Sequence, residues 1–242
     1  MSIIGFVPNP ETATMVVAWI QTLAEKDEET TFLCHETGFD GRTAQAVREA
    51  LGEKGDSVST LIAIDDPMPV ARVREYVRKR NVRLLVTGPF ALPTEGGKDQ
   101  TSDELVRSTS CQTFALLYGE KGPSEIKRVL FVPTGGEHDR SALRLVDTLR
   151  QRRMAQVTIG AIEDETGAKA GQTGERYIRA LLHDMALDVE AFEVKVVVDR
   201  LKHRGIITLF EDHDLVVTGM SAAKRVSPLQ QSLGNNATVA LV

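Results

Sequence analysis

Along the chain, short apolar runs alternate with longer stretches in which apolar residues recur every three or four positions. The short runs are rich in Val, Ile and Leu, which is typical of strands buried in a parallel sheet. They predict strands at 3–8, 31–35, 58–64, 82–87, 113–118, 129–133, 156–162, 192–198, 215–218 and 238–242. The longer stretches predict helices at 11–23, 43–51, 70–80, 139–153, 174–185 and 201–210, and one more after the capping box Thr101-Ser-Asp-Glu104. Strands that alternate with single helices predict right-handed crossovers and a parallel sheet with helices on both faces.

Two of the predicted strands are near copies of each other. Asp214-Leu-Val-Val-Thr-Gly-Met-Ser221 matches Arg83-Leu-Leu-Val-Thr-Gly-Pro-Phe90 in the other half of the chain. In each copy the glycine, Gly88 or Gly219, marks the carboxyl end of the strand. Ligands of open α/β sheets bind at that end, where the strand order reverses. A functional site is therefore expected around Gly88 and Gly219.

Further matches extend this likeness over the whole chain. Val7-Pro8 matches Val132-Pro133, Glu36-Thr-Gly38 matches Glu165-Thr-Gly167, Gly41-Arg-Thr43 matches Gly171-Gln-Thr173, and Thr113-Phe-Ala-Leu116 matches Thr238-Val-Ala-Leu241. The pairs keep the same order at an offset of about 125 to 131 residues, which chance would not maintain. The sequence thus predicts two tandem α/β units, at 1–119 and 125–242. The Gly- and Pro-containing segment 120–124 is the predicted linker.

Composition narrows the class of protein. The 242 residues suffice for two units with separate cores, and the net charge of −5 disfavours nucleic acid as the main partner. Apolar stretches are too short to cross a bilayer, and the amino end lacks the pattern of a signal peptide. We therefore expect a cytoplasmic protein without membrane insertion. Cys34 and Cys111 have neither disulfide nor zinc-type spacing and read as buried, inert thiols.

The second half carries the clearest family resemblance. Val132-Pro-Thr-Gly-Gly-Glu-His-Asp-Arg-Ser-Ala-Leu143 after a strand, Asp214-Leu-Val-Val-Thr-Gly219, and a terminal Thr-Val-Ala-Leu strand together resemble the universal stress protein family. The first half resembles it more faintly, through Val7-Pro8 and 84–88. The resemblance implies five-stranded parallel sheets of order 3-2-1-4-5 and pairing of the two copies along their last strands. In some members of the family, ATP binds at the switch point between the first and fourth strands.

The resemblance also says which residues would bind a nucleotide. Nucleotide-binding members carry an Asp after the first strand and a phosphate loop with two early glycines and a later Gly-Ser or Gly-Thr, whose backbone N–H groups approach the phosphates. Here Thr134 stands at the Asp position of the second half, Ala91 and Ala222 replace the second loop glycine, and the second-half loop is shortened. The candidate binding residues are Gly88, Gly96, Gly97, Lys98, Thr101, Thr134, Gly135, Gly136, Gly219 and Ser221.

Each candidate also has a purely structural interpretation. Gly96-Gly97-Lys98 is either an anion cradle or a solvated loop, and the nearby acids Asp99, Asp103 and Glu104 would repel phosphate. Thr134-Gly135-Gly136 either accepts an adenine or ribose, or forms a tight turn from strand to helix.

Other polar groups favour structural roles. His138 is expected at a helix start rather than as a base. Glu211-Asp-His-Asp214 resembles a metal cluster but reads as a solvated loop, because neighbouring residues on a turn seldom converge on one ion. A basic run, Arg72, Arg74, Arg78, Lys79, Arg80 and Arg83, is expected to complement a helix end, with an acidic partner as the alternative.

Three hypotheses about function follow. Paired carboxylates, a nucleophile triad, metal-ligand spacing and a complete phosphate loop are not found in the sequence, which disfavours an enzyme. The first hypothesis is a non-catalytic regulatory protein of the universal stress type with at most residual nucleotide binding. It acts through its surface and through pairing of its two copies, and the expected partners are a second copy of the chain and a regulatory protein. The second is a switch that binds ATP or AMP near Gly88 and Lys98. The third, a nucleotide hydrolase, rests on analogy of fold alone.

Overall fold

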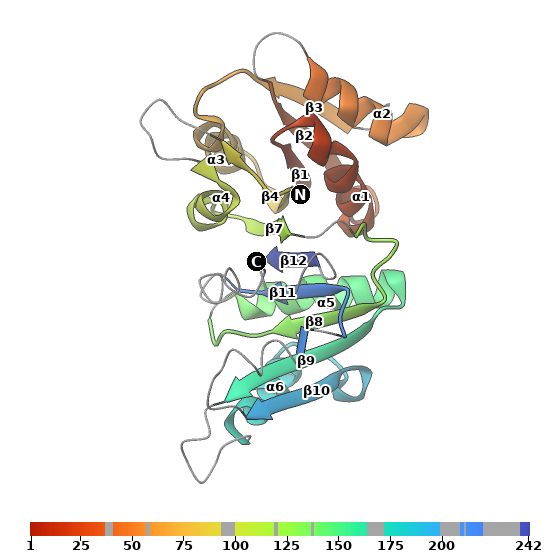
Figure 1. Cartoon of the computed structure of the whole chain (residues 1–242), viewed down its shortest axis with the longest axis vertical. Coiled ribbons are helices and arrows are strands. Elements are labelled where there is room, and N and C mark those ends of the chain that lie inside the picture. The colour runs from red at the N-terminus through yellow and green to blue at the C-terminus, as the bar shows by residue number, and fades with distance from the viewer. Residues whose placement is uncertain are drawn as a thin grey trace. The chain divides into compact units, whose positions relative to one another are not determined.

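A computed structural model describes residues 1–36, 41–56, 59–92, 100–118, 121–136, 138–163, 172–198, 209–210, 212–219 and 238–242. The chain divides into two compact units, Met1–Leu117 and Tyr118–Val242. Figure 1 shows their elements. Each unit is described by itself.

The first unit is built on five parallel strands. They are β1 (Ser2–Val7), β2 (Glu29–His35), β3 (Ser59–Ile64), β4 (Val82–Thr87) and β7 (Gln112–Tyr118). Their order is β3-β2-β1-β4-β7, and every neighbouring pair is parallel. The order therefore reverses between β1 and β4, which makes that pair the switch point of the unit.

Helices cover both faces of this sheet (Figure 1). The 3₁₀ turn η1 (Pro10–Thr12) leads into α1 (Ala13–Leu23), and α2 (Arg42–Asp56), α3 (Pro69–Lys79) and α4 (Ser102–Ser108) follow. The α1 helix approaches β1 closely, because a Cβ built on Gly5 would lie 2.6 Å from Ile20 Cδ1. On the opposite face, α3 buries Val70, Val73 and Val77 in a core cluster with Ile4 and other sheet residues. The predicted apolar stripes are therefore the faces that these helices bury.

The second unit has the same strand order. Its strands are β8 (Arg128–Val132), β9 (Gln156–Glu163), β10 (Glu193–Val198), β11 (Leu215–Thr218) and β12 (Thr238–Leu241), arranged β10-β9-β8-β11-β12 and parallel throughout. Helices α5 (Asp139–Arg153) and α6 (Gln172–Asp184) and the turn η2 (Val189–Ala191) complete the described elements. The switch point here lies between β8 and β11. Most of the helix predicted at 201–210 lies outside the described residues.

The predicted fold class, with strand order 3-2-1-4-5 in each half, is confirmed. Two details differ. The α2 helix runs on to Asp56, with Gly52 interrupting it at a φ of +65°. The segment after Gly88, whose content of Gly and Pro predicts a loop, contains a short antiparallel pair, β5 (Ala91–Leu92) with β6 (Gln100–Thr101).

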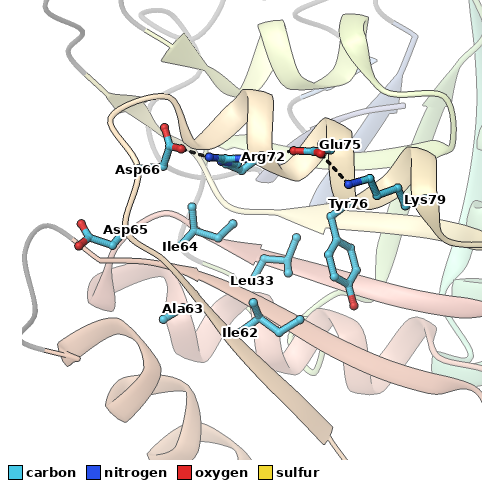
Figure 2. Close-up of a pocket in the computed structure, with 10 residues that line it drawn as sticks. All are labelled: Leu33, Ile62, Ala63, Ile64, Asp65, Asp66, Arg72, Glu75, Tyr76 and Lys79. Atoms are coloured by element: carbon cyan, nitrogen blue, oxygen red, sulfur yellow. Dashed lines mark hydrogen bonds and ion pairs between the residues drawn. The ribbon is translucent and has the colours of Figure 1, made fainter.

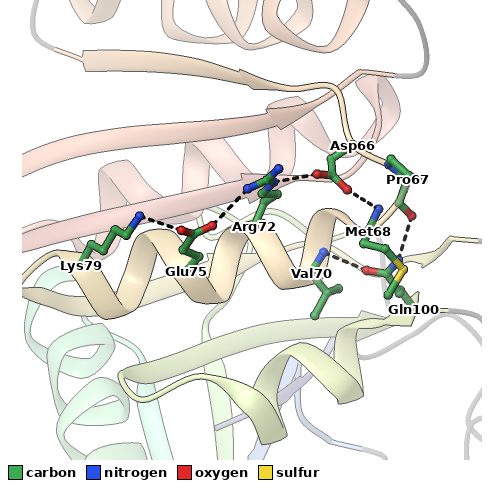
Figure 3. A network of polar contacts seen from close by, with 8 residues as sticks. All are labelled: Asp66, Pro67, Met68, Val70, Arg72, Glu75, Lys79 and Gln100. Carbon is green, nitrogen blue, oxygen red and sulfur yellow. Dashed lines mark hydrogen bonds and ion pairs between the residues drawn. The ribbon is translucent and has the colours of Figure 1, made fainter.

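A buried glutamine accounts for this added pair. Gln100 Oε1 accepts a hydrogen bond from Val70 N at 2.9 Å, and its Nε2 donates to the Pro67 carbonyl at 3.0 Å (Figure 3). The side chain thereby satisfies an amide at the start of α3, one of the groups that a helix leaves without an intrahelical partner. The returning chain is fixed to α3 by these bonds.

Candidate functional site

The switch point of the first unit is closed by the start of α1. A Cβ built on Gly88, just after β4, would lie 2.9 Å from Thr12 Cβ and 3.2 Å from Met15 Cε. Thr12 is itself held in place by Asn9. Asn9 Oδ1 accepts from Thr12 N at 3.1 Å, and Thr12 Oγ1 donates to the Asn9 carbonyl at 3.0 Å. Side chains from the β1 to α1 turn therefore lie directly against the glycine where a ligand was expected.

The chain after Gly88 is also tied down. Ser102 Oγ donates to the Gly88 carbonyl at 3.2 Å and accepts from Phe90 N at 3.0 Å. Thr101 Oγ1 accepts from Glu104 N at 3.3 Å, so the predicted cap of the following helix is confirmed. The structure thus brings Gly88 and Thr101 into one neighbourhood. The other first-half candidates, Gly96, Gly97 and Lys98, lie outside the described residues.

The switch point of the second unit is closed in the same manner. A Cβ built on Gly219, just after β11, would lie 2.8 Å from Thr134 Oγ1 and 3.2 Å from Thr134 Cγ2. Thr134 comes from the turn between β8 and α5, as Thr12 comes from the turn between β1 and α1. Ser221, the remaining second-half candidate, lies outside the described residues.

The Asp139 carboxylate accepts hydrogen bonds from the backbone N–H groups of this second turn. It is fully buried and accepts from Thr134 N at 3.0 Å, Thr134 Oγ1 at 3.2 Å and Gly135 N at 2.8 Å. Gly135 adopts a φ of +80°, a conformation that glycine permits at little cost. Convergent N–H groups of this kind form an anion-binding site. Here the chain supplies its own anion, an arrangement that favours the tight-turn interpretation of Thr134-Gly135-Gly136.

Tyr177 completes the arrangement around Asp139. Its hydroxyl donates to Asp139 Oδ2 at 2.8 Å, and burial, together with this bond to a carboxylate, raises the pKa of Tyr177 to about 12. Gly136, Arg140 and Tyr177 line a pocket of about 330 Å³ between α5 and α6. The sequence interpretation placed Asp139 only at a helix start and did not single out Tyr177. An acidic residue directly after a Gly-Gly turn was the available signal.

Two residues of the cluster predicted as a solvated loop before β11, His213 and Asp214, are buried or partly buried, whereas Asp212 is exposed and Glu211 lies outside the described residues. His213 Nδ1 lies 2.6 Å from the Leu209 carbonyl, and its Nε2 lies 3.1 Å from Thr158 Oγ1. Asp214 contacts Lys121 Nζ at 2.6 Å and accepts from Arg128 N at 2.9 Å. These two residues do lie in the loop before the strand, but they are not solvated, because they bind different partners and fix the start of the strand. No group of three His, Cys, Asp or Glu residues in the described parts of the chain could hold a metal ion.

The basic run also divides between different roles. Arg78 and Lys79 lie in the last turn of α3, as expected for complementing its carboxyl end. Arg83 lies on β4 and binds Glu28, 2.6 Å away, whose side chain is only 4% exposed. Arg83 is therefore part of a partly buried ion pair. It does not complement the carboxyl end of α3 as expected, but donates to the Leu23 carbonyl at the end of α1 at 3.1 Å. His138, as expected, is at the start of α5.

Comparisons with known proteins support the fold. No protein-family model matches the chain, and no curated protein matches its sequence. A universal stress protein from Archaeoglobus fulgidus DSM 4304 has a TM-score of 0.60 at 12% identity, covering 98% of this chain and 95% of that one. A putative universal stress protein from Pseudomonas aeruginosa UCBPP-PA14 gives 0.57 at 14% identity, covering 100% and 92%.

A third similar structure is the cytoplasmic domain of a prokaryotic cation chloride cotransporter. Its TM-score is 0.65 at 12% identity, covering 99% of this chain and 94% of that one. At such identities the likeness shows the fold, which is that of the universal stress proteins. In the described parts of the chain, no helix is long and apolar enough to cross a membrane.

Proposed function

We propose that this chain is a non-catalytic regulatory protein of the universal stress type, in which both nucleotide-binding loops have degenerated. The observation that carries the proposal is the contact of Thr12 with Gly88 and of Thr134 with Gly219. Both contacts lie at the switch points, where open α/β sheets bind ligands. The alanines at 91 and 222, which replace loop glycines of nucleotide-binding members, agree with this proposal.

The buried carboxylate of Asp139 supports the same conclusion for the second unit. A phosphate placed on the amides of Thr134 and Gly135 would have to displace a carboxylate that accepts four hydrogen bonds. It would also meet the negative charge of that carboxylate, and like charges at close range disfavour binding. The turn is therefore a poor phosphate site although its backbone has the geometry of one.

A protein of this kind acts through its surface. The two units, with equal strand order and matched sequence segments, are proposed to be copies of one ancestral unit that pair with each other. A cytoplasmic location, a homodimer and a regulatory protein partner belong to the same proposal. The likeness to the cotransporter domain makes a membrane transport protein one partner to test. Light scattering of the purified chain tests the homodimer directly.

Thermal unfolding in the presence of nucleotide tests the central proposal. A ligand that binds only the folded state at about 100 times its Kd stabilises it by about 2.7 kcal/mol, which shifts the midpoint by several degrees. The proposal expects no shift with millimolar ATP-Mg or AMP. A saturable shift would favour the second hypothesis, a nucleotide-responsive switch.

Substitution of Lys98 tests whether the nucleotide of such a switch binds at the Gly96-Gly97 loop. Under the second hypothesis, Lys98→Ala removes the countercharge of the Gly96-Gly97 loop and should weaken the nucleotide-induced shift. Lys26→Ala, which removes an exposed lysine from the turn before β2, is the matched control and should leave the shift unchanged. Phosphate release above background in the same samples would support the third hypothesis, a hydrolase.

A further inference from the structure

The charged groups at the rim of the pocket in the first unit pair with each other. This pocket has a volume of about 440 Å³ and lies between β3 and α3 (Figure 2). Asp66, Arg72, Glu75 and Lys79 are joined in one network of ion pairs. Asp65, the remaining acid of the lining, is exposed and directed away from the apolar floor (Figure 2). The ion pairs of this rim are therefore complete without a ligand.

A network of three polar side chains in the second unit holds fewer hydrogens than its contacts require. Thr158 of β9 lies between His213, which precedes β11, and Glu193, the first residue of β10. Thr158 Oγ1 lies 3.1 Å from His213 Nε2 and 2.9 Å from Glu193 Oε2. Thr158 and His213 are buried, and Glu193 is the residue that pairs with Thr158 in the register of the two strands. We call these three residues the Thr158 network.

The Leu209 carbonyl determines which nitrogen of His213 carries the hydrogen. This oxygen lies 2.6 Å from His213 Nδ1, and a carbonyl oxygen can only accept. His213 Nδ1 is therefore the donor. In a neutral imidazole the other nitrogen, Nε2, is then an acceptor. The hydroxyl of Thr158 has to donate its single hydrogen to that nitrogen.

One hydrogen cannot serve both contacts of Thr158. When the hydroxyl donates to His213 Nε2, Thr158 Oγ1 and the Glu193 carboxylate face each other with lone pairs only. One additional proton resolves this conflict at either end of the network. On His213, it makes Nε2 a donor to Thr158, whose hydroxyl then donates to Glu193. On Glu193, it makes the carboxyl group a donor to Thr158, whose hydroxyl then donates to His213.

We propose that the Thr158 network is a pH-dependent contact that holds the start of β10 against β9 when it binds one additional proton. Without that proton, Thr158 donates to His213, and Glu193 loses its hydrogen bond and turns to solvent. β10 is the outer strand of the second unit, so the network controls how firmly this edge is attached. Thr158 and Glu193 lie near the amino ends of their strands, whereas the switch point lies at the carboxyl ends. The contact is therefore independent of nucleotide binding.

The groups around His213 set the pH range of this contact. Burial lowers the pKa of His213 below its ordinary value of 6.5, and the positive charge of Arg128 on β8 adds to the shift. The Leu209 carbonyl, Asp212 and Glu193 oppose it. The network therefore takes up its proton on acidification below about pH 6.5. Burial of the charged imidazole costs free energy at the same time, so the tighter contact at β10 is local and does not stabilise the whole chain.

Nuclear magnetic resonance of the full chain tests the network, with ¹⁵N in histidine and ¹³C in the carboxyl groups of glutamate. His213→Gln and Glu193→Gln assign the two signals. Above the midpoint of its titration, His213 should show the tautomer with the hydrogen on Nδ1. The Glu193 carboxyl signal should shift at the midpoint of the His213 titration. A hydrogen on Nε2 instead, or a Glu193 signal that does not follow His213, would overturn the proposal.

Substitution of Thr158 distinguishes a hydrogen-bonded network from attraction between charges alone. Thr158→Val removes the hydroxyl at nearly the same volume, so the Glu193 signal should no longer respond to the titration of His213. Thr158→Ser keeps the hydroxyl and should retain the response. A response that persists in Thr158→Val would show that charge alone couples the two groups and would contradict the network. Loss of the response in Thr158→Ser as well would also contradict it.

Glu193→Gln supplies the missing hydrogen without a change of pH. Its amide can donate to Thr158 Oγ1 while the hydroxyl donates to the neutral His213. The variant also removes a charge that stabilises the imidazolium, so the midpoint of the His213 titration should fall by about 0.2 to 0.7 pH units. Glu190→Gln, which neutralises an exposed carboxylate on η2, is the matched control and should leave the midpoint unchanged. Equal shifts in the two variants would contradict a specific role of Glu193.

Discussion

Replacement of Gly219 by alanine measures how firmly Thr134 fills the switch point of the second unit. The new Cβ would lie 2.8 Å from Thr134 Oγ1 and 3.2 Å from its Cγ2, both closer than ordinary contact. Threonine is stiff at χ1, so the side chain has little freedom to turn away. Overpacking of this kind typically costs about 1 to 3 kcal/mol, and we expect Gly219→Ala to lower the free energy of unfolding by that amount.

A second substitution isolates the steric cause. Thr134→Ala removes both clashing atoms, and the nearest remaining atom, Thr134 Cβ, lies 3.6 Å away, an ordinary contact. The single change also removes the hydrogen bond from Thr134 Oγ1 to Asp139 and should cost about 1 kcal/mol or more. In the Thr134→Ala background, however, Gly219→Ala should be nearly neutral. The predicted coupling between the two sites is therefore about 1 to 3 kcal/mol.

Urea unfolding followed by far-UV circular dichroism gives the four free energies of this cycle, and amide exchange at β11 shows that the change is local. Thr134→Val is the matched control, because it loses the same hydrogen bond but keeps both branches of the side chain. It should not rescue Gly219→Ala. The proposal that Thr134 fills the switch point is refuted if Gly219→Ala leaves the free energy of unfolding of the wild-type chain unchanged. It is also refuted if the substitution lowers that free energy equally in the wild-type, Thr134→Ala and Thr134→Val backgrounds.

Three further predictions follow from buried charge. Asp139→Asn should lower the free energy of unfolding by about 1.5 to 3 kcal/mol, because it removes a charged hydrogen-bond acceptor. It should also lower the pKa of Tyr177 from about 12, which ultraviolet titration of the phenol measures. An unchanged titration would contradict the contact between Tyr177 and Asp139. Burial lowers the pKa of His213 below 6.5, so protonation of its imidazole favours the unfolded chain. The free energy of unfolding should therefore fall as the pH drops below about 6.5, by at most about 1.4 kcal/mol per pH unit. Urea unfolding at pH 7.5 and 5.5 should show a smaller fall in His213→Gln than in wild type, and equal falls would contradict this role. Burial raises the pKa of Glu28, but hydrogen bonds from Arg83 and from the Glu25 amide outweigh it and leave the pKa below 4.5. Arg83→Met should therefore cost about 2 kcal/mol at pH 7, within the range for a hydrogen bond to a charged group, and less as the pH falls and the carboxylate becomes protonated. A pH-independent cost in urea unfolding would argue against the pair.

The course of the chain could be read from local pattern because burial imposes it directly. The run from Leu215 to Thr218 is apolar on both faces and is a buried central strand. Trp19, Ile20 and Leu23 lie on the predicted stripe of α1 and are all buried. The pairing of Ala91–Leu92 with Gln100–Thr101 escaped prediction because Gln100 is held by the start of α3, some thirty residues away in sequence. Such tertiary contacts leave no periodic signal.

Whether side chains fill the candidate sites also depends on contacts between residues that are distant in sequence. The sequence indicated Gly88 and Gly219 as the ends of central strands, and they are. Thr12 and Thr134, from the turns after β1 and β8, lie against these glycines. The spacing of residues could not predict these contacts, since Thr12 and Gly88 are distant along the chain. Asp139 likewise looked like an ordinary first-turn acid of a helix, and its bonds to Thr134 and Gly135 appeared only in three dimensions.

Calorimetric titration of the full chain with ATP-Mg measures the central claim most directly, since it reports binding at either switch point without a label. The closed contacts at Gly88 and Gly219 predict only the heat of dilution up to millimolar nucleotide. A saturable binding isotherm with about one or two nucleotides per chain would show that Thr12 or Thr134 yields to a ligand, and would contradict the account.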